Sequence, residues 1–285
     1  MYDTIIIGAG PAGVSAAIYL KRFNYNPLII YKDFGTLGKT TYIDNYYGLE
    51  HIKGSELAEK GLNQAKSLGI DIVNDEVTAI EYDALGFKVT TKESSFVATT
   101  VFLATGKARN KLLVKGIKEF EGKGISYCAI CDGFFYRGKK LGLIGNGAFA
   151  EGEYETLKKF TSDITLFTNG LDTTIKADKI VSEKIVLVYG NEFVSGIETE
   201  NNKYDLDGIF IAYGTANAQS FAKHLGLQLD NQDNIVAKEY MTNIPGIFAG
   251  GDVIGGLLQV SKAVSDGANA SLEIKKYLMS KKSHN

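Results

Sequence analysis

The sequence is poor in the residues that build most metal sites. It has only two cysteines, Cys128 and Cys131, in 285 residues, and its three histidines, His51, His224 and His284, are scattered. A structural zinc site needs four ligands, and the sequence has neither a second cysteine pair nor a spaced histidine pair. We therefore predict no metal site. Two cysteines are also too few for the disulfide-stapled scaffold of a small secreted protein.

Arginine is almost absent. Arg22, Arg109 and Arg137 are the only three, and the other basic residues are lysines. This matters because the arginine guanidinium is the side chain best shaped to fork a phosphate. The formal net charge of −2 gives no reason to expect nucleic acid as a partner.

Long hydrophobic runs are missing as well. No apolar stretch approaches the roughly 20 residues of a membrane span, and no charged region followed by a long apolar run follows Met1. We therefore predict a cytoplasmic protein with no membrane segment. With 45% hydrophobic and 22% charged residues, the chain has the composition of a soluble globular protein, and 285 residues suffice for two domains.

The two cysteines lie in the stretch Cys128-Ala129-Ile130-Cys131-Asp132. A pair at this spacing can close a small strained disulfide, and one thiol can lower the pKa of the other. The carboxyl group that follows could pass protons to and from the thiols. We favour redox chemistry, with a partial metal site and two inert buried cysteines as alternatives.

The N-terminus carries a dinucleotide-binding pattern. An apolar strand at 4–7 is followed by Gly8, Gly10 and Gly13, then by a helix over 11–23 and a strand over 27–31. The first glycine makes the turn, the second lets the backbone approach a pyrophosphate, and the third lets the helix pack on the strand. The helix N-terminus offers N–H donors to the phosphates, and an acid near Asp33 would bind a ribose hydroxyl.

Further elements complete an open α/β pattern. We predict a helix over 55–69, short strands over 70–73, 77–82, 86–91 and 100–104, a strand before Gly250, and a helix that contains 260–272. Small residues at Ala104-Thr105-Gly106 let the chain pass close to a ligand at the end of a strand. Asp252 is well placed to hold a ribityl or ribose hydroxyl, and the basic tail from 275 is expected to fray.

A second glycine pattern follows a second apolar strand. Gly145, Gly147 and Ala150 precede a helix that runs to about 160, and a strand over 163–167 comes next. An NAD enzyme carries an acid after this strand, and an NADP enzyme carries arginines. The stretch 168–176 contains no arginine. We therefore expect nicotinamide binding to be weak or lost, although normal NADPH use stays open.

The segment 107–140 is locally basic, with nine lysines and arginines against three acids. A solvated surface is the simpler interpretation. A docking face for an acidic partner is the alternative.

With these motifs in this order, the whole chain resembles the low-molecular-weight thioredoxin reductases. Besides the glycine patterns, the resemblance rests on the run from Cys128 to Tyr136 and on Gly250-Gly251-Asp252-Val253. It implies an α/β protein of two Rossmann-like domains, one inserted into the other. It assigns 1–113 plus 240–285 to an FAD-binding domain and 114–239 to an inserted domain that carries the redox disulfide.

The resemblance also implies roles for individual residues, and a homodimer. Cys131 would face the flavin, Cys128 would attack the protein substrate thioredoxin, and Asp132 would be the proton donor. The residues that it assigns to FAD are Gly8, Gly10, Pro11, Ala12, Gly13, Tyr31, Lys32, Asp33, Thr36, Thr40, Asn45, Val77, Ala104, Thr105, Gly106, Gly251, Asp252, Gln259 and Val260.

The sequence departs from the family pattern at two places. Phe167-Thr168-Asn169 stands where the NADPH-dependent members carry His-Arg-Arg, and Leu258 stands where an arginine usually precedes the glutamine. The first departure is similar to the ferredoxin-dependent flavin thioredoxin reductases. We therefore predict a thioredoxin reductase that takes electrons from reduced ferredoxin. The alternatives are an NAD(P)H-dependent reductase with a degenerate site, a dithiol oxidase of related sequence, and a redox-sensing flavoprotein without turnover.

Overall fold

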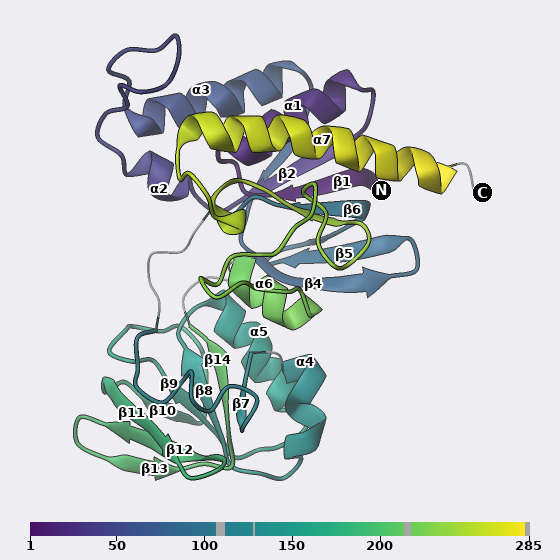
Figure 1. Cartoon of the computed structure of the whole chain (residues 1–285). Coiled ribbons are helices and arrows are strands. Elements are labelled where there is room, and N and C mark those ends of the chain that lie inside the picture. The colour runs from purple at the N-terminus through teal and green to yellow at the C-terminus, as the bar shows by residue number, and fades with distance from the viewer. Residues whose placement is uncertain (107–111, 128, 214–217, 283–285) are drawn as a thin grey trace. The chain divides into compact units, whose positions relative to one another are not determined.

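The structure is a computed structural model that describes residues 1–106, 112–127, 129–213 and 218–282. The chain divides into two compact units (Figure 1). The first unit comprises residues 1–107 and 217–285, and the second comprises residues 108–216. The predicted class, α/β with two Rossmann-like units of which one is inserted into the other, is confirmed. No helix of the described residues has the length and hydrophobicity to span a bilayer.

The first unit is built on a seven-stranded sheet in the order β3-β2-β1-β6-β5-β4, with β15 also paired to β6. Its strands are β1 (Tyr2–Ile7), β2 (Pro27–Tyr31), β3 (Asp71–Asn74), β4 (Val77–Asp83), β5 (Gly86–Thr91), β6 (Ser95–Leu103) and β15 (Ile247–Ala249). Its helices are α1 (Pro11–Arg22), α2 (Gly35–Gly38), α3 (Gly54–Ser67), α6 (Ala218–Leu225), α7 (Val260–Lys282) and the 3₁₀ turn η2 (Gly251–Ile254).

The parallel strands β3, β2, β1, β6 and β15 form the centre of this unit. The side chains of β2, of β15 and of the second halves of β1 and β6 are mostly buried and aliphatic, which is typical of a parallel sheet covered by helices, whereas the edge strand β3 is partly exposed. The first half of β6 pairs antiparallel with β5, and its second half pairs parallel with β15. The carboxyl ends of β1, β6 and β15 therefore meet at one edge, which is where open α/β sheets bind ligands.

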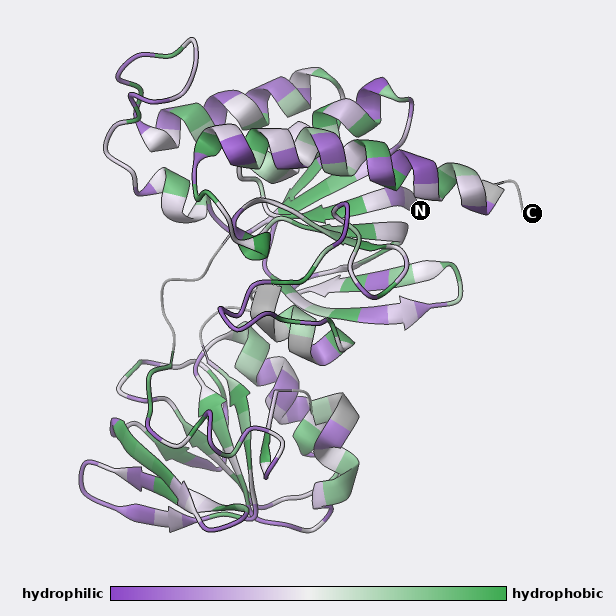
Figure 2. Ribbon diagram, in the orientation of Figure 1, coloured by the Kyte–Doolittle hydropathy of each residue, from purple (hydrophilic) through white to green (hydrophobic). Residues whose placement is uncertain are grey.

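Helices α1, α3 and α7 form a layer over one face of this sheet (Figure 1), and the central strands are hydrophobic along most of their length (Figure 2). Helices α1 and α7 pack so closely that a Cβ on Gly267 would lie only 2.1 Å from the Ala12 carbonyl oxygen. The absence of a side chain at Gly267 allows this approach. Helix α7 continues to Lys282, so the prediction that the tail frays from 275 is wrong. Ile274 and Leu278 are buried in the core and hold this last part of the helix.

The second unit contains a five-stranded parallel sheet in the order β10-β9-β8-β14-β7 and a three-stranded antiparallel sheet, β11-β12-β13. Its strands are β7 (Ile125–Ser126), β8 (Leu141–Gly145), β9 (Ile164–Phe167), β10 (Lys179–Val181), β11 (Ile185–Gly190), β12 (Val194–Thr199), β13 (Lys203–Asp205) and β14 (Gly208–Ala212). Its helices are α4 (Ala129–Asp132), the 3₁₀ turn η1 (Gly133–Tyr136) and α5 (Ala148–Leu157).

The sequence patterns identified the strands and helices of both glycine motifs to within a few residues. They did not predict the antiparallel sheet, in which β12 pairs with β11, through two register shifts, and with β13. These strands alternate between buried and exposed residues over only three to six positions, which is too short for a firm periodicity.

The return to the first unit comes at residue 217, earlier than the predicted boundary at 240. Helix α6 packs against β4, and the Ile235 N–H donates to the Val253 carbonyl at 2.8 Å. Residues 218–239 therefore belong to the first unit, because these contacts join them to its sheet and to η2.

Candidate functional site

The first glycine turn is fixed by contacts between backbones. Gly8 has a φ of +115°, and a Cβ there would lie 2.3 Å from the Ala104 carbonyl oxygen. A Cβ on Gly13 would lie 2.0 Å from the Gly8 carbonyl oxygen. The Gly8 N–H donates to the Ile30 carbonyl at 2.8 Å, so the turn is tied to the end of β2. Only glycine fits at Gly8 and Gly13 without moving the helix or the strand.

Gly10 differs, because a Cβ there would meet nothing within 4 Å. The chain itself therefore does not require glycine at this position, whereas a phosphate resting on the backbone would. Gly10 is the N-cap of α1, Pro11 is its first residue, and no acidic side chain lies in the first turn. The free N–H groups of such a turn attract an anion. These residues fit the pyrophosphate of a dinucleotide.

The end of β2 gathers several of the predicted residues. Tyr31 stacks on Phe34, with ring centroids 5.7 Å apart. One carboxylate oxygen of the exposed Asp33 accepts the Gly35 N–H at 2.7 Å, which closes a tight turn beyond the strand. Lys32 pairs with the buried Glu76 at 3.1 Å, and this contact brings the start of β4 to the end of β2.

Three more of the predicted FAD residues lie in the neighbouring segments. Val77, next to Glu76, is buried at the start of β4. Thr36 lies in α2, and its carbonyl accepts the Thr40 hydroxyl at 3.0 Å. The Thr40 carbonyl in turn accepts the Gly54 N–H at 3.0 Å, so this segment is anchored to the start of α3.

Two predicted flavin-site residues that are far apart in the sequence meet directly. The Asn45 side-chain amide donates to the Gln259 side-chain oxygen at 3.0 Å. Gln259 immediately precedes α7, whose first residue is Val260. Ala104, Thr105 and Gly106 follow β6, and the Cα of Thr105 also lies close to the first glycine turn. The structure therefore collects the residues around the ends of β1, β2, β6 and β15.

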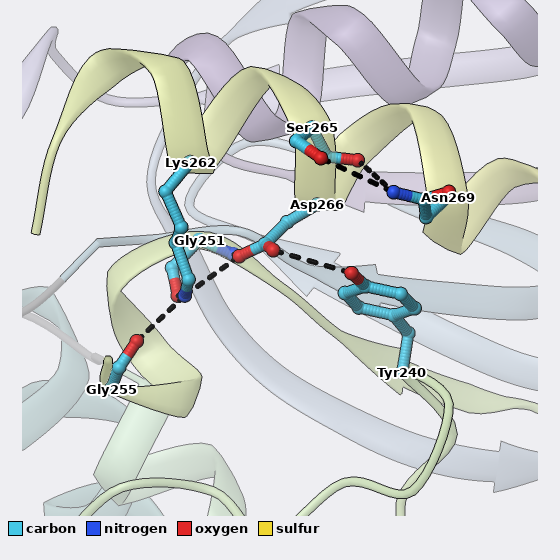
Figure 3. Close-up of polar contacts among 7 residues, drawn as sticks. All are labelled: Tyr240, Gly251, Gly255, Lys262, Ser265, Asp266 and Asn269. Atoms are coloured by element: carbon cyan, nitrogen blue, oxygen red, sulfur yellow. Dashed lines mark hydrogen bonds and ion pairs between the residues drawn. The ribbon is translucent and has the colours of Figure 1, made fainter. Parts of the chain in front are cut away.

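A buried ion pair on α7 holds the turn after β15 (Figure 3). Asp266, only 5% exposed, accepts the Gly251 N–H at 2.8 Å and pairs with Lys262 at 2.7 Å. The Lys262 ammonium also donates to the carbonyl oxygens of Gly251 and Gly255, at 2.9 and 2.6 Å. Asp266 thus binds the backbone just before Asp252, the predicted sugar ligand, and Lys262 binds it on both sides of that residue.

Two supporting contacts complete this cluster. The Tyr240 hydroxyl donates to the other Asp266 oxygen at 3.4 Å, and burial is the first cause of the raised pKa of Tyr240. Gly251 has a φ of +77°, and a Cβ there would lie 3.0 Å from the Ala12 Cβ. The turn therefore packs against the start of α1, next to the first glycine turn.

The redox motif is described in part. Cys128 lies outside the described residues, and so does the side chain of Cys131, whose backbone belongs to α4. Asp132 ends α4, is half-buried and accepts the Ser126 hydroxyl at 2.7 Å. Burial and the Asp132 charge both raise the pKa of Tyr136. The predicted proton donor thus sits in a partly buried setting beside a hydroxyl and a phenol.

A second acid lies under the redox motif. Glu153, on α5, is 7% exposed, and its carboxylate accepts the Ala129 N–H at 2.6 Å. Burial raises the pKa of Glu153 to about 7, against a smaller opposing effect of this hydrogen bond. Ala129 is fully buried, in one hydrophobic cluster with Phe149 and Leu157 of α5.

The second glycine turn shares the strand–helix packing of the first. A Cβ on Gly145 would lie 2.4 Å from the Ala212 carbonyl oxygen at the end of β14. Its surroundings differ, because the Asn146 amide donates to the Asp172 carbonyl at 3.0 Å and the Asn146 carbonyl accepts the Thr173 hydroxyl at 2.9 Å. The glycine turn is thus bonded to the loop in which an NADP enzyme holds the 2′-phosphate.

At the two arginine positions, the backbone N–H of Thr168 and the side chain of Asn169 are bonded within the protein. Thr168 is fully buried, and its N–H donates to the Val181 carbonyl at 2.9 Å. Asn169 has a φ of +52°, and its side-chain oxygen accepts the Ile185 N–H at 2.8 Å. Helix α5 also carries Glu151 in its first turn, which opposes anion binding there.

Sequence reasoning missed Ser126, Glu153, Lys262 and Asp266. A signal existed for Glu153, because it lies four residues after Phe149 and four before Leu157, on the buried stripe of its helix. Lys262 and Asp266 are likewise spaced by four on α7. A charged residue on an apolar helix stripe marks a buried partner.

Comparison with known proteins places the chain among disulfide oxidoreductases. Residues 2–267 match the family described as pyridine nucleotide-disulphide oxidoreductase. A thioredoxin reductase of Listeria monocytogenes is 32% identical over 301 residues, covering 98% of this chain and 94% of that protein.

Two solved structures are similar over nearly the whole chain. The atypical thioredoxin reductase TRi from Desulfovibrio vulgaris Hildenborough has a TM-score of 0.91 and 34% identity, with 98% of this chain and 99% of that chain covered. A ferredoxin-flavin thioredoxin reductase from Clostridium acetobutylicum has a TM-score of 0.77 and 30% identity, with 98% of each chain covered.

Proposed function

This chain belongs to the pyridine nucleotide-disulphide oxidoreductase family, an FAD-binding family, and on that premise we propose that it is a thioredoxin-disulfide reductase. In this proposal electrons pass from reduced ferredoxin through FAD and the Cys128–Cys131 disulfide to thioredoxin. The motif Cys128-Ala129-Ile130-Cys131-Asp132, in a chain with no other cysteine, is the observation that carries the reductase activity.

The thiol steps take the roles that the family resemblance gives to the two cysteines. The Cys128 thiolate attacks one sulfur of the thioredoxin disulfide, and one thioredoxin thiolate leaves. The Cys131 thiolate then attacks the Cys128 sulfur, which reforms the Cys128–Cys131 disulfide and releases the second thioredoxin thiolate. Asp132 gives a proton to the leaving thiolate and recovers it from the other thiol. FAD held by the first glycine turn and the turn at Asp252 would supply the conversion between a one-electron donor and the two-electron reduction of the disulfide.

The surface after the redox motif suits a protein substrate. Phe134 and Phe135 are 64% and 75% exposed, and the Arg137 guanidinium carbon lies 5.5 Å from the centre of the Phe134 ring. Aromatic residues and arginine are enriched where proteins bind each other. We propose that this exposed pair contacts thioredoxin.

Trapping of a mixed disulfide tests the reductase activity. Cys131→Ser leaves Cys128 able to attack but removes the resolving thiol, so this variant should retain thioredoxin covalently on a non-reducing gel. Cys128→Ser is the matched control and should retain none. Equal trapping by both variants would contradict the assigned roles.

The choice of electron donor rests on the second glycine turn. Neither Thr168 nor Asn169 can fork a phosphate, Asn146 is bonded to the loop that would hold one, and Glu151 opposes an anion. Low-potential ferredoxins have reduction potentials of about −400 mV, and thioredoxin has one of about −270 mV. Two electrons falling through this difference release roughly 6 kcal/mol, so ferredoxin is an adequate donor.

The basic segment 107–140 gives this donor a docking face in the proposal. Its described basic residues are all exposed, and they are Lys115, Lys118, Lys123, Arg137, Lys139 and Lys140. Positive charge attracts an acidic protein such as ferredoxin, most strongly at low salt. The triple reversal of Lys115, Lys118 and Lys123 to Glu should raise the KM for ferredoxin steeply at low salt. The paired reversal of Lys60 and Lys66 on α3 is the control.

Anaerobic flavin bleaching tests the donor. Oxidised protein is mixed with reduced ferredoxin, with NADPH and with NADH in separate cuvettes, and the flavin absorbance is followed. Rapid bleaching by ferredoxin alone is expected. Equally rapid bleaching by NADPH would overturn the donor assignment and leave the thiol chemistry intact.

A further inference from the structure

The buried acid Glu153 is not used by the thiol steps above. Its carboxylate accepts the N–H of Ala129 at 2.6 Å, and that nitrogen is bonded to the carbonyl carbon of Cys128. Ala129 begins α4, so its N–H has no partner within the helix. Glu153 therefore supplies, from α5, the acceptor that the first turn of the redox motif lacks.

An uncharged acceptor would serve this purpose at lower cost. Burying a carboxylate is unfavourable unless it is paired, and the pKa of Glu153 is raised to about 7, chiefly by burial. Among the described residues Glu153 has no ion-pair partner, and no opposite charge contributes to its raised pKa. Strands β8 and β14, which pack on α5, carry no titratable residue, and α4 carries Cys131 and Asp132. The turn η1 adds Tyr136, and the segment 175–178, which also packs on α5, adds the exposed Lys176 and Asp178. The chain thus has an acid where an amide or a hydroxyl would satisfy the same N–H.

We propose that Glu153 is a positioning residue for the redox pair, which fixes the start of α4 through Ala129 and tunes the reactivity of the thiols through its own charge. This inference rests on the proposed redox function of Cys128 and Cys131. Neutral Glu153 leaves thiolate formation unhindered. Ionised Glu153 adds a negative charge next to the motif, and a like charge disfavours a second anion.

A pH dependence follows, since Glu153 changes charge near neutral pH. At pH 5.5 Glu153 is protonated, and Glu153→Gln should leave thiol reactivity unchanged. At pH 8 Glu153 is ionised, and removal of its charge should increase the thiolate fraction. Because one pKa unit is a factor of ten, we expect roughly a 3- to 10-fold faster reaction of the variant at pH 8.

The experiment is alkylation of the reduced holoenzyme by iodoacetamide between pH 5.5 and pH 8. Mass spectrometry of the two cysteine-containing sites gives the rate for each residue. The alkylation rate of Glu153→Gln, divided by that of the protein with its natural sequence, should be near 1 at pH 5.5. This ratio should rise with pH. Glu155→Gln, which removes an exposed acid paired with Lys158 on the same helix, should keep a ratio of 1 throughout.

A ratio that stays at 1, or one that is changed by the same factor at every pH, would overturn the role of the Glu153 charge. Glutamine can accept the Ala129 N–H, so this variant tests charge and keeps the fold. The measurement needs neither ferredoxin nor thioredoxin. If oxidation of the unmodified protein fails to protect both cysteines from alkylation, the proposed function itself fails. Protection together with a flat ratio refutes the inference alone.

Discussion

The two glycine turns of this chain share one geometry and differ in what surrounds it. In each, the first glycine packs against a carbonyl at the end of the neighbouring parallel strand. Gly8 packs against Ala104, just after β6, and Gly145 packs against Ala212, the last residue of β14. At the third position the first turn has Gly13 and the second has Ala150, which adds a methyl group between the turn and its helix.

The helices differ in their charges. Helix α1 has no acid in its first turn, and Gly10 there has open space beside it. Helix α5 has Glu151 in its first turn and the buried Glu153 two residues later. The comparison teaches that the glycine pattern is first a packing requirement of a strand and a helix. Nucleotide binding depends on the charges and loops around that pattern, and here the second helix supports the redox motif.

The largest effect is expected for Gly13→Ala. The new methyl group would lie 2.0 Å from the Gly8 carbonyl oxygen, so the helix must move away from the turn. Overpacking of this kind costs about 3 kcal/mol of unfolding free energy, and the displaced helix N-terminus should also lose FAD. Urea unfolding and the ratio of flavin to protein absorbance measure the two losses.

Ala150→Gly is the matched change in the second turn. It should cost only about 1 kcal/mol from the lower helix propensity of glycine and leave FAD bound. Comparable losses from both variants would show that the two turns impose the same constraint.

The next effect concerns the buried pair that holds the turn around Asp252. Lys262→Met leaves Asp266 buried without its cation, which should lower the free energy of unfolding by about 3 kcal/mol. This is the low end for a broken buried ion pair, because Lys262 is partly exposed. FAD affinity should fall, because Gly251 and Gly255 lose a shared donor. Flavin titration of the apoprotein measures this loss.

The exposed pair Lys276–Glu273 on the same helix is the control for Lys262→Met. Lys276→Met should have a far smaller effect on stability than Lys262→Met and leave flavin affinity unchanged. An equally small effect of Lys262→Met would show that the buried pair does not hold the turn.

A smaller effect, and one confined to the second unit, is the pH dependence that Glu153 imposes on stability. Its pKa is about 7 in the folded protein and near 4.5 when unfolded, so the folded state binds more protons between these values. Stability should therefore fall as pH rises, by roughly 2 kcal/mol between pH 5 and pH 7.5. Glu153→Gln should remove this fall, as measured by urea unfolding at several pH values. A fall of the same size in the variant would assign it to other groups.

Much of the fold could be predicted from the sequence, and so could the gathering of the residues assigned to FAD, because both depend on local patterns. Glycine spacing, short apolar strands and the Asp33 and Asp252 junctions each act within a few residues. The contacts between Asn45 and Gln259, or between Glu153 and Ala129, depend on which segments come together in the fold, and spacing does not encode this. The three-stranded sheet was missed for a related reason, since its pairing and not its periodicity defines it.

The smallest effects on stability are expected at two buried threonines, one in each unit. The Thr4 hydroxyl lies 2.8 Å from the Thr100 hydroxyl, which itself donates to the Asp3 carbonyl. Thr4→Val removes this hydrogen bond and should cost about 1 kcal/mol. Among the described residues, the Thr168 hydroxyl stands out as buried without a hydrogen-bond partner. Thr168→Val loses no bond there, so it should leave stability unchanged or raise it by up to about 1 kcal/mol. Urea unfolding of both variants measures the difference, and a loss at Thr168 equal to that at Thr4 would mean that its hydroxyl does bind a partner, such as a buried water.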